Sequence, residues 1–259
     1  MTIRLEIAHG LASVIFDNPA ALNAMDAAMA PRLAQVTAQI AADPSVRVVL
    51  LRAEGPAFGV GGDIGHFRED LAGLPAALRE LGHEINPAIA ALRELPAIVV
   101  AAVHGAVAGG SVGLMSTADL VIAAESTKFN LAYARIGGSP DIGNSWFLPR
   151  LVGPRRALEL LLLSESFDAQ AALRYGLVNQ VVPDAQLGAA AEALVARLLA
   201  GPREAYARIK RLVYRSERTS LRQQLDDEIE NFAQLAETED FAEGVAAFLE
   251  KRAPKFGSA

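Results

Sequence analysis

The stretch from residue 95 to residue 153 constrains the fold of this 259-residue chain more than any other. Its sequence is LPAIVVAAVHGAVAGGSVGLMSTADLVIAAESTKFNLAYARIGGSPDIGNSWFLPRLVG. It predicts a buried strand, a glycine-rich turn, a helix, a second strand and a second glycine-rich loop. The run AIVVAAV is typical of a strand that is covered on both faces. Gly109 and Gly110 let the backbone approach a ligand closely, and a helix beginning there would direct its N–H groups at an anion.

One acidic residue, Asp141, lies in the second glycine-rich loop, among Gly138, Pro140 and Gly143. A set of backbone donors followed by a lone carboxylate indicates proton transfer beside a carbonyl group. Burial in an apolar pocket would raise the pKa of this carboxylate and make it a better base. Alternatively, the Asp141 side chain caps a helix that begins directly after it, as aspartate often does.

Strands and helices alternate over most of the chain, which indicates the α/β class with parallel strand pairing. Two strand-like pieces flank a His-Gly turn within residues 3–16. Further strands are predicted at 46–53, 97–103, 120–124, 128–130 and 178–182. Helices are predicted at 25–41, 74–95, 110–117, 166–176, 185–199, 202–215, 220–236 and 241–252. The chain is therefore rich in strands first and in helices last.

Composition limits the classes of function. The chain is 52% hydrophobic, which supplies ample core, and it has no cysteine for disulfides or thiolate metal sites. Its net charge of −6 argues against broad binding to nucleic acid. No apolar run approaches the roughly 18 residues that span a bilayer, and the first residues lack the apolar region of a signal peptide. We therefore expect a cytoplasmic protein with no membrane or nucleic-acid partner.

Five segments, in order along the chain, resemble the crotonase (enoyl-CoA hydratase/isomerase) family. They are FDNPAALNAMD (16–26), AFGVGGDI (57–64), HGAVAGGSVGLMSTAD (104–119), PRLVGPRRALELLLLSESFDAQAALRYGLVNQVVP (149–183) and FAEGVAAFLEKRAPKF (241–256). The resemblance covers nearly the whole chain. It implies an α/β core, a crotonase-like spiral of ββα units over residues 1–200, and a helical C-terminal oligomerisation part over 201–259. It also implies an acyl-CoA thioester substrate and neither a metal nor a redox cofactor, because coenzyme A is part of the substrate.

The resemblance assigns roles to backbone groups first. The N–H groups of Gly62 and Gly110 would form an oxyanion hole for the thioester carbonyl, and the turn that contacts the adenine falls around Val60. Classical hydratases of the family use two glutamates, whose positions are Gly113 and Tyr133 in this sequence. Both glutamates are therefore absent, which argues against ordinary hydration.

Asp141 stands where related isomerases carry an aspartate, among them the ring-epoxide isomerase of phenylacetate breakdown. The resemblance therefore implies a double-bond isomerase in which Asp141 moves a proton and the oxyanion hole holds the enolate. Three alternatives stay open. Asp141 acts as the nucleophile of a hydrolase or dehalogenase, or the chain is a hydratase, or it is an acyl-CoA-binding protein without catalysis.

Four side chains are further candidates for contact with the substrate. Asp63 faces the substrate or braces its loop, and Tyr133 donates a hydrogen bond or only packs. Trp146 would favour an apolar or aromatic acyl group. Glu84 matches the position of a histidine in related dehalogenases, or it lies on the solvated face of its helix.

Coenzyme A and self-association complete the expectations from the resemblance. Residues expected to contact coenzyme A are Ala21, Leu22, Phe248 and Lys251, the last two reaching a site in the same or a neighbouring subunit. Cations for its diphosphate are Lys210 with Arg211, or Lys251 with Arg252, unless they form only the charged face of a helix. The family's assemblies predict a homotrimer or a dimer of trimers.

Overall fold

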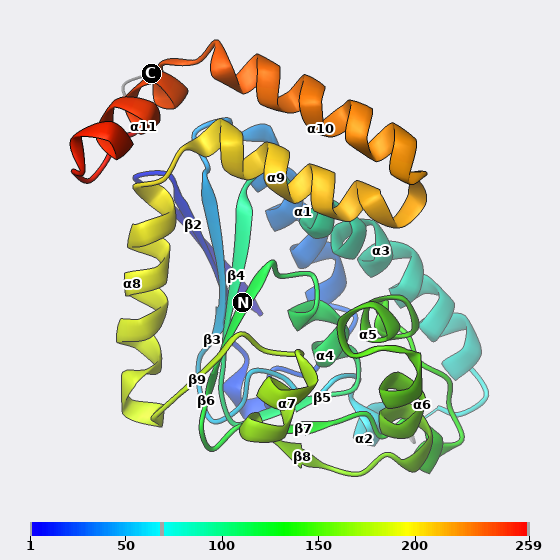
Figure 1. Cartoon of the computed structure of the whole chain (residues 1–259). Helices are drawn as coiled ribbons and strands as arrows, with labels where there is room; N and C mark the ends of the chain where they lie inside the picture. The colour runs from blue at the N-terminus through cyan, green and yellow to red at the C-terminus, as the bar shows by residue number, and fades with distance from the viewer. Residues whose placement is uncertain (1, 68–69, 258–259) are drawn as a thin grey trace.

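The computed structural model describes residues 2–67 and 70–257, and it shows a mixed α/β fold with two sheets (Figure 1). The larger sheet has the strand order β1-β2-β3-β4-β6-β9, and the smaller has the order β5-β7-β8. The larger sheet contains β1 (Ile3–Ala8), β2 (Leu11–Phe16), β3 (Val48–Ala53), β4 (Ile98–Val103), β6 (Leu120–Ala124) and β9 (Gln180–Val182). The smaller contains β5 (Ala106–Ala108), β7 (Lys128–Asn130) and β8 (Phe167–Asp168).

Helices surround the sheets and fill most of the C-terminal half. The α-helices are α1 (Met29–Ala42), α2 (Ile64–Phe67), α3 (Leu74–Glu94), α4 (Gly110–Met115), α5 (Asn144–Val152), α6 (Pro154–Leu163), α7 (Ala169–Tyr175), α8 (Leu187–Leu199), α9 (Arg203–Arg215), α10 (Leu221–Ala236) and α11 (Glu239–Glu250). Short 3-10 turns are η1 (Pro19–Ala21), η2 (Ala134–Ile136), η3 (Asp184–Gln186) and η4 (Ser216–Arg218). No helix of the described ranges is both long enough and apolar enough to cross a bilayer.

Strand pairing follows the predicted pattern. The N-terminal hairpin β1–β2 is antiparallel, and the strands from β2 to β9 in the larger sheet pair in parallel. Strand β4 is buried on both faces because its side chains alternate between two cores. Val100 and Ala102 pack with Ala191 and Val195 of α8, while the residues between them join the main core beneath α1 and α3. The prediction of a doubly covered strand is therefore confirmed.

Two helices begin later than the sequence predicts, where an aspartate accepts hydrogen bonds from backbone N–H groups at the helix start. The helix predicted from residue 25 begins at Met29, because the Asp26 carboxylate accepts the N–H groups of Ala28 and Met29. The helix predicted from residue 166 begins at Ala169, because Asp168 accepts the N–H of Ala171 at 2.8 Å. Strand β5 was not predicted, since its three residues lie inside the glycine-rich turn.

The parallel strands β3 and β4 bring two loops together. Both run in the same direction, with Leu51 opposite Ala101, so the chain leaves them at the same edge of the sheet. Ligands of open parallel sheets bind at such carboxyl ends. The loop after β3 then returns alongside β5, where Gly59 and Val107 form a bridge. The loops that carry Gly62 and Gly110 are therefore neighbours.

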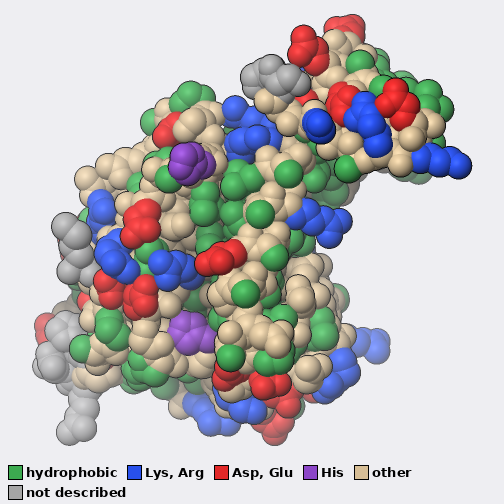
Figure 2. Space-filling model, turned by 90° about the vertical axis from the view of Figure 1, so that its left-hand side faces the viewer, with side chains coloured by type: hydrophobic (Ala, Val, Ile, Leu, Met, Phe, Trp, Pro, Cys, Tyr) green, Lys and Arg blue, Asp and Glu red, His purple; other side chains and the backbone are tan. Residues whose placement is uncertain are grey.

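The C-terminal helices leave apolar side chains uncovered. In Figure 1, α9 lies across the top of the large sheet, α10 runs above it and α11 stands apart at the end. Figure 2 shows this end of the chain as a lobe that projects from the body, with hydrophobic and charged side chains mixed on it. Large exposed apolar residues lie along α10 and α11: Leu221, Leu225, Ile229, Phe232, Val245, Phe248 and Leu249. The limit at residue 200 between core and C-terminal part stays a prediction.

Candidate active site

Backbone contact holds the two glycine-rich loops against each other. The Gly61 N–H donates to the buried Ser111 Oγ at 3.1 Å. A Cβ on Gly61 would lie 2.9 Å from the Ala108 carbonyl oxygen and 3.0 Å from the Gly110 nitrogen. Gly61 also has φ +79°, a conformation that side chains rarely adopt. Glycine is therefore required at position 61 by both space and conformation.

Gly62 and Gly110 lie where these two loops meet, beside one cavity. Gly110 is the first residue of α4. Gly62 directly follows Gly61, the residue that contacts the other loop. Within the described ranges, neither the Gly62 nor the Gly110 N–H donates a backbone hydrogen bond. Both glycines line one cavity of about 1090 Å³, so both donors can serve a ligand there.

Asp141 reaches the same cavity and is held by a tyrosine. The Tyr133 hydroxyl donates to Asp141 Oδ1 at 2.5 Å. The same oxygen lies 3.6 Å from the point where a Cβ on Gly110 would stand, which places the carboxyl group beside the Gly110 amide. A base and a backbone donor thus lie side by side.

The Asn144 side chain contacts both Tyr133 and Asp141 and holds them in place. Its Nδ2 lies 3.0 Å from the Tyr133 hydroxyl oxygen, 3.1 Å from the Gly109 carbonyl and 3.2 Å from the Asp141 carbonyl. All three neighbours accept hydrogen bonds, which identifies the amide nitrogen as the group that faces them. Asn144 is fully buried, so this network has a fixed geometry.

The Asp141 side chain does not cap a helix. Gly143 occupies the N-cap position of α5, and it makes no side-chain capping bond. Between them, Ile142 has φ 46°, which is costly for a β-branched residue. Strain of this kind persists where the surrounding structure imposes it, and it is common at functional sites. The capping alternative for Asp141 is therefore wrong.

Gly113 closes the site beneath this loop. A Cβ at position 113 would collide with the Ile142 carbonyl oxygen and lie 3.0 Å from Asn144 Nδ2. No side chain fits there while the loop keeps this position. The strained loop with Asp141 thus occupies the space that a side chain on Gly113 would need.

The packing around Asp141 and Tyr133 raises the pKa of both side chains. Asp141 opens onto the cavity, yet desolvation by the surrounding atoms raises the pKa of its carboxyl group, and the hydrogen bond from Tyr133 partly opposes that rise. Desolvation and the neighbouring Asp141 charge raise the pKa of Tyr133 well above its usual value. Tyr133 therefore stays a protonated donor, and Asp141 is a stronger base than an exposed aspartate.

Comparison with known proteins places the chain in a family. The family model described as "Enoyl-CoA hydratase/isomerase" matches residues 6–259. The chain belongs to this family, the crotonases. It is 40% identical over 255 residues to a protein of Rhodobacter capsulatus named "Probable enoyl-CoA hydratase", covering 98% of this chain and 97% of that one. It is 35% identical to the 1,2-epoxyphenylacetyl-CoA isomerase of Escherichia coli, covering 96% of each chain.

The crotonase fold is confirmed by solved structures. A crystal structure of an enoyl-CoA hydratase from Polaromonas sp. JS666 superposes with a TM-score of 0.91 at 30% identity, covering 98% of this chain and 99% of that one. The protein is thus an enzyme of the crotonase family, with a sheet core and C-terminal helices. Names of both hydratases and isomerases occur among its relatives.

Several residues that were expected to contact the substrate line one cavity in the structure. Val60, Tyr133 and Trp146 line the same cavity as Gly62, Gly110 and Asp141. Asp63 is half-buried directly after Gly62 and does not line that cavity. Their roles toward a ligand stay predictions.

Glu84 does not reach the cavity. It is exposed on α3, whereas His83 and Asn86 of that helix line the wall. With 3.6 residues per turn, Glu84 points about 100° away from His83. The expectation for Glu84 is therefore not supported by its position.

The residues expected to contact coenzyme A lie in two separate parts of the structure. Ala21 ends η1, and Leu22 follows it with 41% of its surface exposed. The next residue, Asn23, is buried and donates to the carbonyls of Glu54 and Ala57 at 3.0 and 2.8 Å. Ala21 and Leu22 are thus tied to the loop after β3, although they do not line the cavity.

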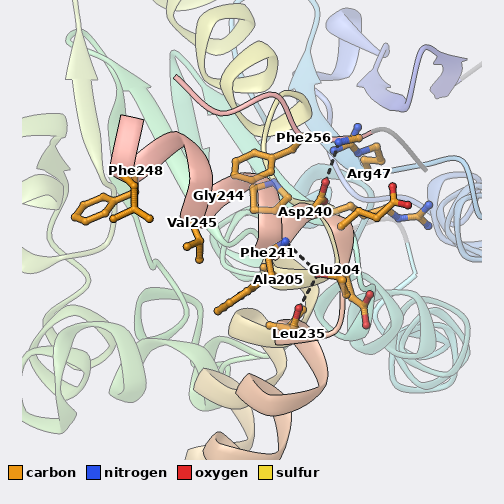
Figure 3. Close-up of a pocket in the computed structure, with 16 residues that line it drawn as sticks. Arg47, Glu204, Ala205, Leu235, Asp240, Phe241, Gly244, Val245, Phe248 and Phe256 are labelled. Atoms are coloured by element: carbon orange, nitrogen blue, oxygen red, sulfur yellow. Dashed lines mark hydrogen bonds between the residues drawn. The ribbon is translucent and has the colours of Figure 1, made fainter. Parts of the chain in front are cut away.

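Phe248 and Lys251 lie elsewhere, on the C-terminal lobe. Phe248 is 83% exposed and borders a separate groove of about 660 Å³ between α9, α11 and the C-terminal tail. Figure 3 shows this groove, lined by Phe241, Val245 and Phe256, with the Phe248 ring at its outer end. In one chain, neither Phe248 nor Lys251 lines the cavity of Asp141.

Lys210 is not a surface cation. Its ammonium group is buried, lies 2.8 Å from the Asp119 carboxylate and donates to the Ala97 carbonyl at 3.0 Å. The expectation that Lys210 binds the diphosphate is therefore wrong, because its charge is already paired inside the protein. Arg211 is exposed and donates to Asn231.

Sequence reasoning missed the residues that brace the site. Ser111 and Asn23 fix the first loop from two sides. Asn144 holds the centre of the network around Asp141 and Tyr133. A polar residue directly after a glycine pair, as in GGS, was the available signal for Ser111. In the described part of the chain, no three His, Cys, Asp or Glu side chains gather at a metal-binding spacing.

Proposed function

We propose that this protein is an acyl-CoA isomerase that shifts a double bond with Asp141 as its acid–base group. The observation that carries the proposal is the position of the Asp141 carboxyl group, beside the Gly110 amide and hydrogen-bonded to Tyr133 at 2.5 Å. One base next to a pair of backbone donors suits a reaction that moves one proton between two carbons.

The proposed reaction converts a 3-enoyl thioester into its 2-enoyl isomer. The Asp141 carboxylate takes a proton from C2, and the electrons of that C–H bond pass to the thioester oxygen. The Gly62 and Gly110 N–H groups stabilise this dienolate, each contributing about 3–4 kcal/mol by analogy with known oxyanion holes. Asp141 then returns the proton to C4, so that the double bond lies between C2 and C3. Atoms balance without water or another reactant.

Gly113 argues against hydration as the main reaction. Adding water across a double bond requires one group to activate the water and another to protonate carbon. Asp141 is present, but position 113 has no side chain, and the Ile142 carbonyl blocks the space that one would need. The hydratase name of the Rhodobacter relative keeps hydration as the second candidate.

The test is to incubate the purified protein with a 3-enoyl-CoA and, in parallel, with a 2-enoyl-CoA. We expect interconversion at constant mass, and we expect Asp141→Asn to lower kcat by about 10²- to 10⁴-fold. Gain of one water by the 2-enoyl substrate would establish hydration instead. Release of free coenzyme A would identify a hydrolase, and unchanged Asp141→Asn turnover would overturn the role of Asp141.

The assembly and surroundings of the enzyme belong to the same proposal. We infer a homotrimer or a dimer of trimers, because apolar side chains lie uncovered along α10 and α11. Phe248 and Lys251 would then reach the coenzyme A of a neighbouring subunit.

We also expect turnover without an added metal or redox cofactor, which assays with a chelator would check. We expect a cytoplasmic location, which cell fractionation would check.

A further inference from the structure

Arg93 is a cation without a partner at the wall of the cavity. Within the described ranges its guanidinium group makes no hydrogen bond or ion pair, and its Nε is buried without an acceptor. Its neighbours are aromatic rings instead. The guanidinium carbon lies 3.2 Å from the ring centroid of Tyr214, 5.7 Å from that of Trp146 and 5.6 Å from that of Phe147.

The acids near Arg93 are already engaged. Asp119 is paired with Lys210 and accepts from the Tyr214 hydroxyl. Glu217 is paired with Arg150 at 2.9 Å. Glu94 lines the same cavity, but it follows Arg93 directly in α3, and successive helix residues do not face each other. Desolvation lowers the pKa of Arg93, and the nearby Tyr214, Asp119 and Glu217 only partly oppose that fall.

Arg93 and the catalytic candidates share one space. The cavity of about 1090 Å³ that holds Gly110 and Asp141 is also lined by Arg93, Trp146 and Arg218. Trp146 lies in the first turn of α5, shortly after the loop with Asp141, and its ring centroid lies 5.7 Å from the Arg93 guanidinium carbon. Arg218 is exposed and, within the described chain, has no ion-pair partner.

A second cavity adjoins this wall and is also cationic. It measures about 560 Å³, and Arg93, Trp146 and Arg218 line it as well. Its other basic residues include Lys210, Arg208 and Arg215, which are paired with Asp119, Glu204 and Asp227. Within the described chain, Arg93, Arg211 and Arg218 have no ion-pair partner, and Glu94 is the acid of this lining that is also unpaired. This excess of positive charge at the wall that the two cavities share attracts an anion.

We propose that Arg93, assisted by Arg218, recognises an anionic group at the far end of the acyl chain. The preferred substrates are then thioesters whose acyl group ends in a carboxylate. This inference depends on the proposed function, because it takes the cavity as the acyl site. A planar guanidinium group binds a carboxylate through two parallel hydrogen bonds. Such a partner would supply the guanidinium group with hydrogen-bond acceptors, which the aromatic rings cannot do.

The test compares the binding of matched saturated thioesters by calorimetry. Adipoyl-CoA is compared with hexanoyl-CoA, and suberoyl-CoA with octanoyl-CoA, because each pair differs only by the terminal carboxylate. We expect the wild-type protein to bind at least one dicarboxylic member about tenfold or more tightly than its partner. Arg93→Met is expected to abolish this preference, and Arg218→Gln to reduce it.

Saturated thioesters cannot isomerise, so this preference is measured independently of Asp141 chemistry. The affinity for hexanoyl-CoA in each variant reports an intact site, and Arg93→Lys tests whether charge alone suffices. Arg197→Gln is the control, because Arg197 is exposed on α8 outside both cavities. Equal affinities within both pairs in the wild type, or a preference that survives Arg93→Met, would overturn the inference alone. Failure of every thioester to bind would overturn the proposed function with it.

Discussion

The behaviour of Asp141 depends on two opposing effects on one carboxyl group. Desolvation raises its pKa, and the hydrogen bond from Tyr133 lowers it again. The first effect makes the group more basic, while the second keeps it ionised and oriented. The Tyr133 hydroxyl therefore acts on both the protonation state and the orientation of Asp141.

Replacing Tyr133 with phenylalanine should shift the pH profile of turnover. Asp141 must be a carboxylate to take the proton, so kcat/KM rises as the pH rises through the pKa of Asp141 in the free enzyme. Without the Tyr133 hydrogen bond, only the hydrogen bond from the Asp141 backbone still opposes desolvation, and the pKa of Asp141 rises further. The rising limb in Tyr133→Phe should therefore lie at higher pH than in the wild type.

The matched control is Tyr175→Phe, because Tyr175 packs against Phe167 and does not line the cavity. It should leave the pH profile unchanged. A Tyr133→Phe profile that coincides with the wild type, or moves to lower pH, would show that the hydroxyl does not act on Asp141.

Gly113 should tolerate no side chain. In Gly113→Ala the added Cβ collides with the Ile142 carbonyl, so the loop must move and Asp141 with it. We expect a loss of about 1–3 kcal/mol in the free energy of unfolding and a clear loss of turnover. Gly188→Ala is the control, since nothing lies within 4 Å of its added Cβ in α8. The free energy of unfolding in urea and kcat of both variants test this prediction. A fully active Gly113→Ala variant would contradict the steric argument.

Among the elements, α9 is attached to the core by a buried ion pair. Lys210 on α9 lies 2.8 Å from Asp119, which precedes β6 and also accepts the Val99 N–H of β4 at 2.8 Å. The same carboxylate accepts from the Tyr214 hydroxyl, one helix turn further along α9. A single aspartate thus connects two strands of the sheet to the first helix of the C-terminal part.

Removing the Lys210 charge should destabilise the protein strongly. Lys210→Met leaves Asp119 buried without its cation, and breaking such a pair costs about 3–5 kcal/mol. The midpoint of urea unfolding should fall without a change in its slope. Lys128→Met is the control, because Lys128 is exposed on β7 and makes no ion pair within the described ranges. A midpoint equal to that of the wild type would show that the pair contributes little.

At the scale of the whole molecule, the uncovered apolar side chains predict self-association. Leu225 and Ile229 lie one turn apart on α10 and are 54% and 65% exposed. We expect light scattering after gel filtration to give three or six copies of the chain. The double variant Leu225→Glu/Ile229→Glu should dissociate into smaller species. Leu71→Glu is the control, because Leu71 is an exposed residue of a loop. A wild-type monomer would refute the proposed assembly.

Comparison of prediction and structure shows what local pattern can supply. The apolar run at 97–103 predicted strand β4, because side-chain alternation and burial act over a few residues. Helices α1 and α7 begin up to four residues later than the hydrophobic period indicated, because Asp26 binds the N–H groups of Ala28 and Met29 and Asp168 caps α7.

The sequence by itself predicted the α/β core, because strand periodicity is a local property. Its resemblance to the crotonases supplied the family and the roles expected of Gly62, Gly110 and Asp141. Only the tertiary structure decided which side chains meet. It brought Tyr133 and Asn144 to Asp141, turned Glu84 away and buried Lys210 against Asp119. It also left Arg93 unpaired at the cavity wall. These outcomes depend on the packing of distant elements, and no local pattern in the chain encodes a contact between residues 93 and 214.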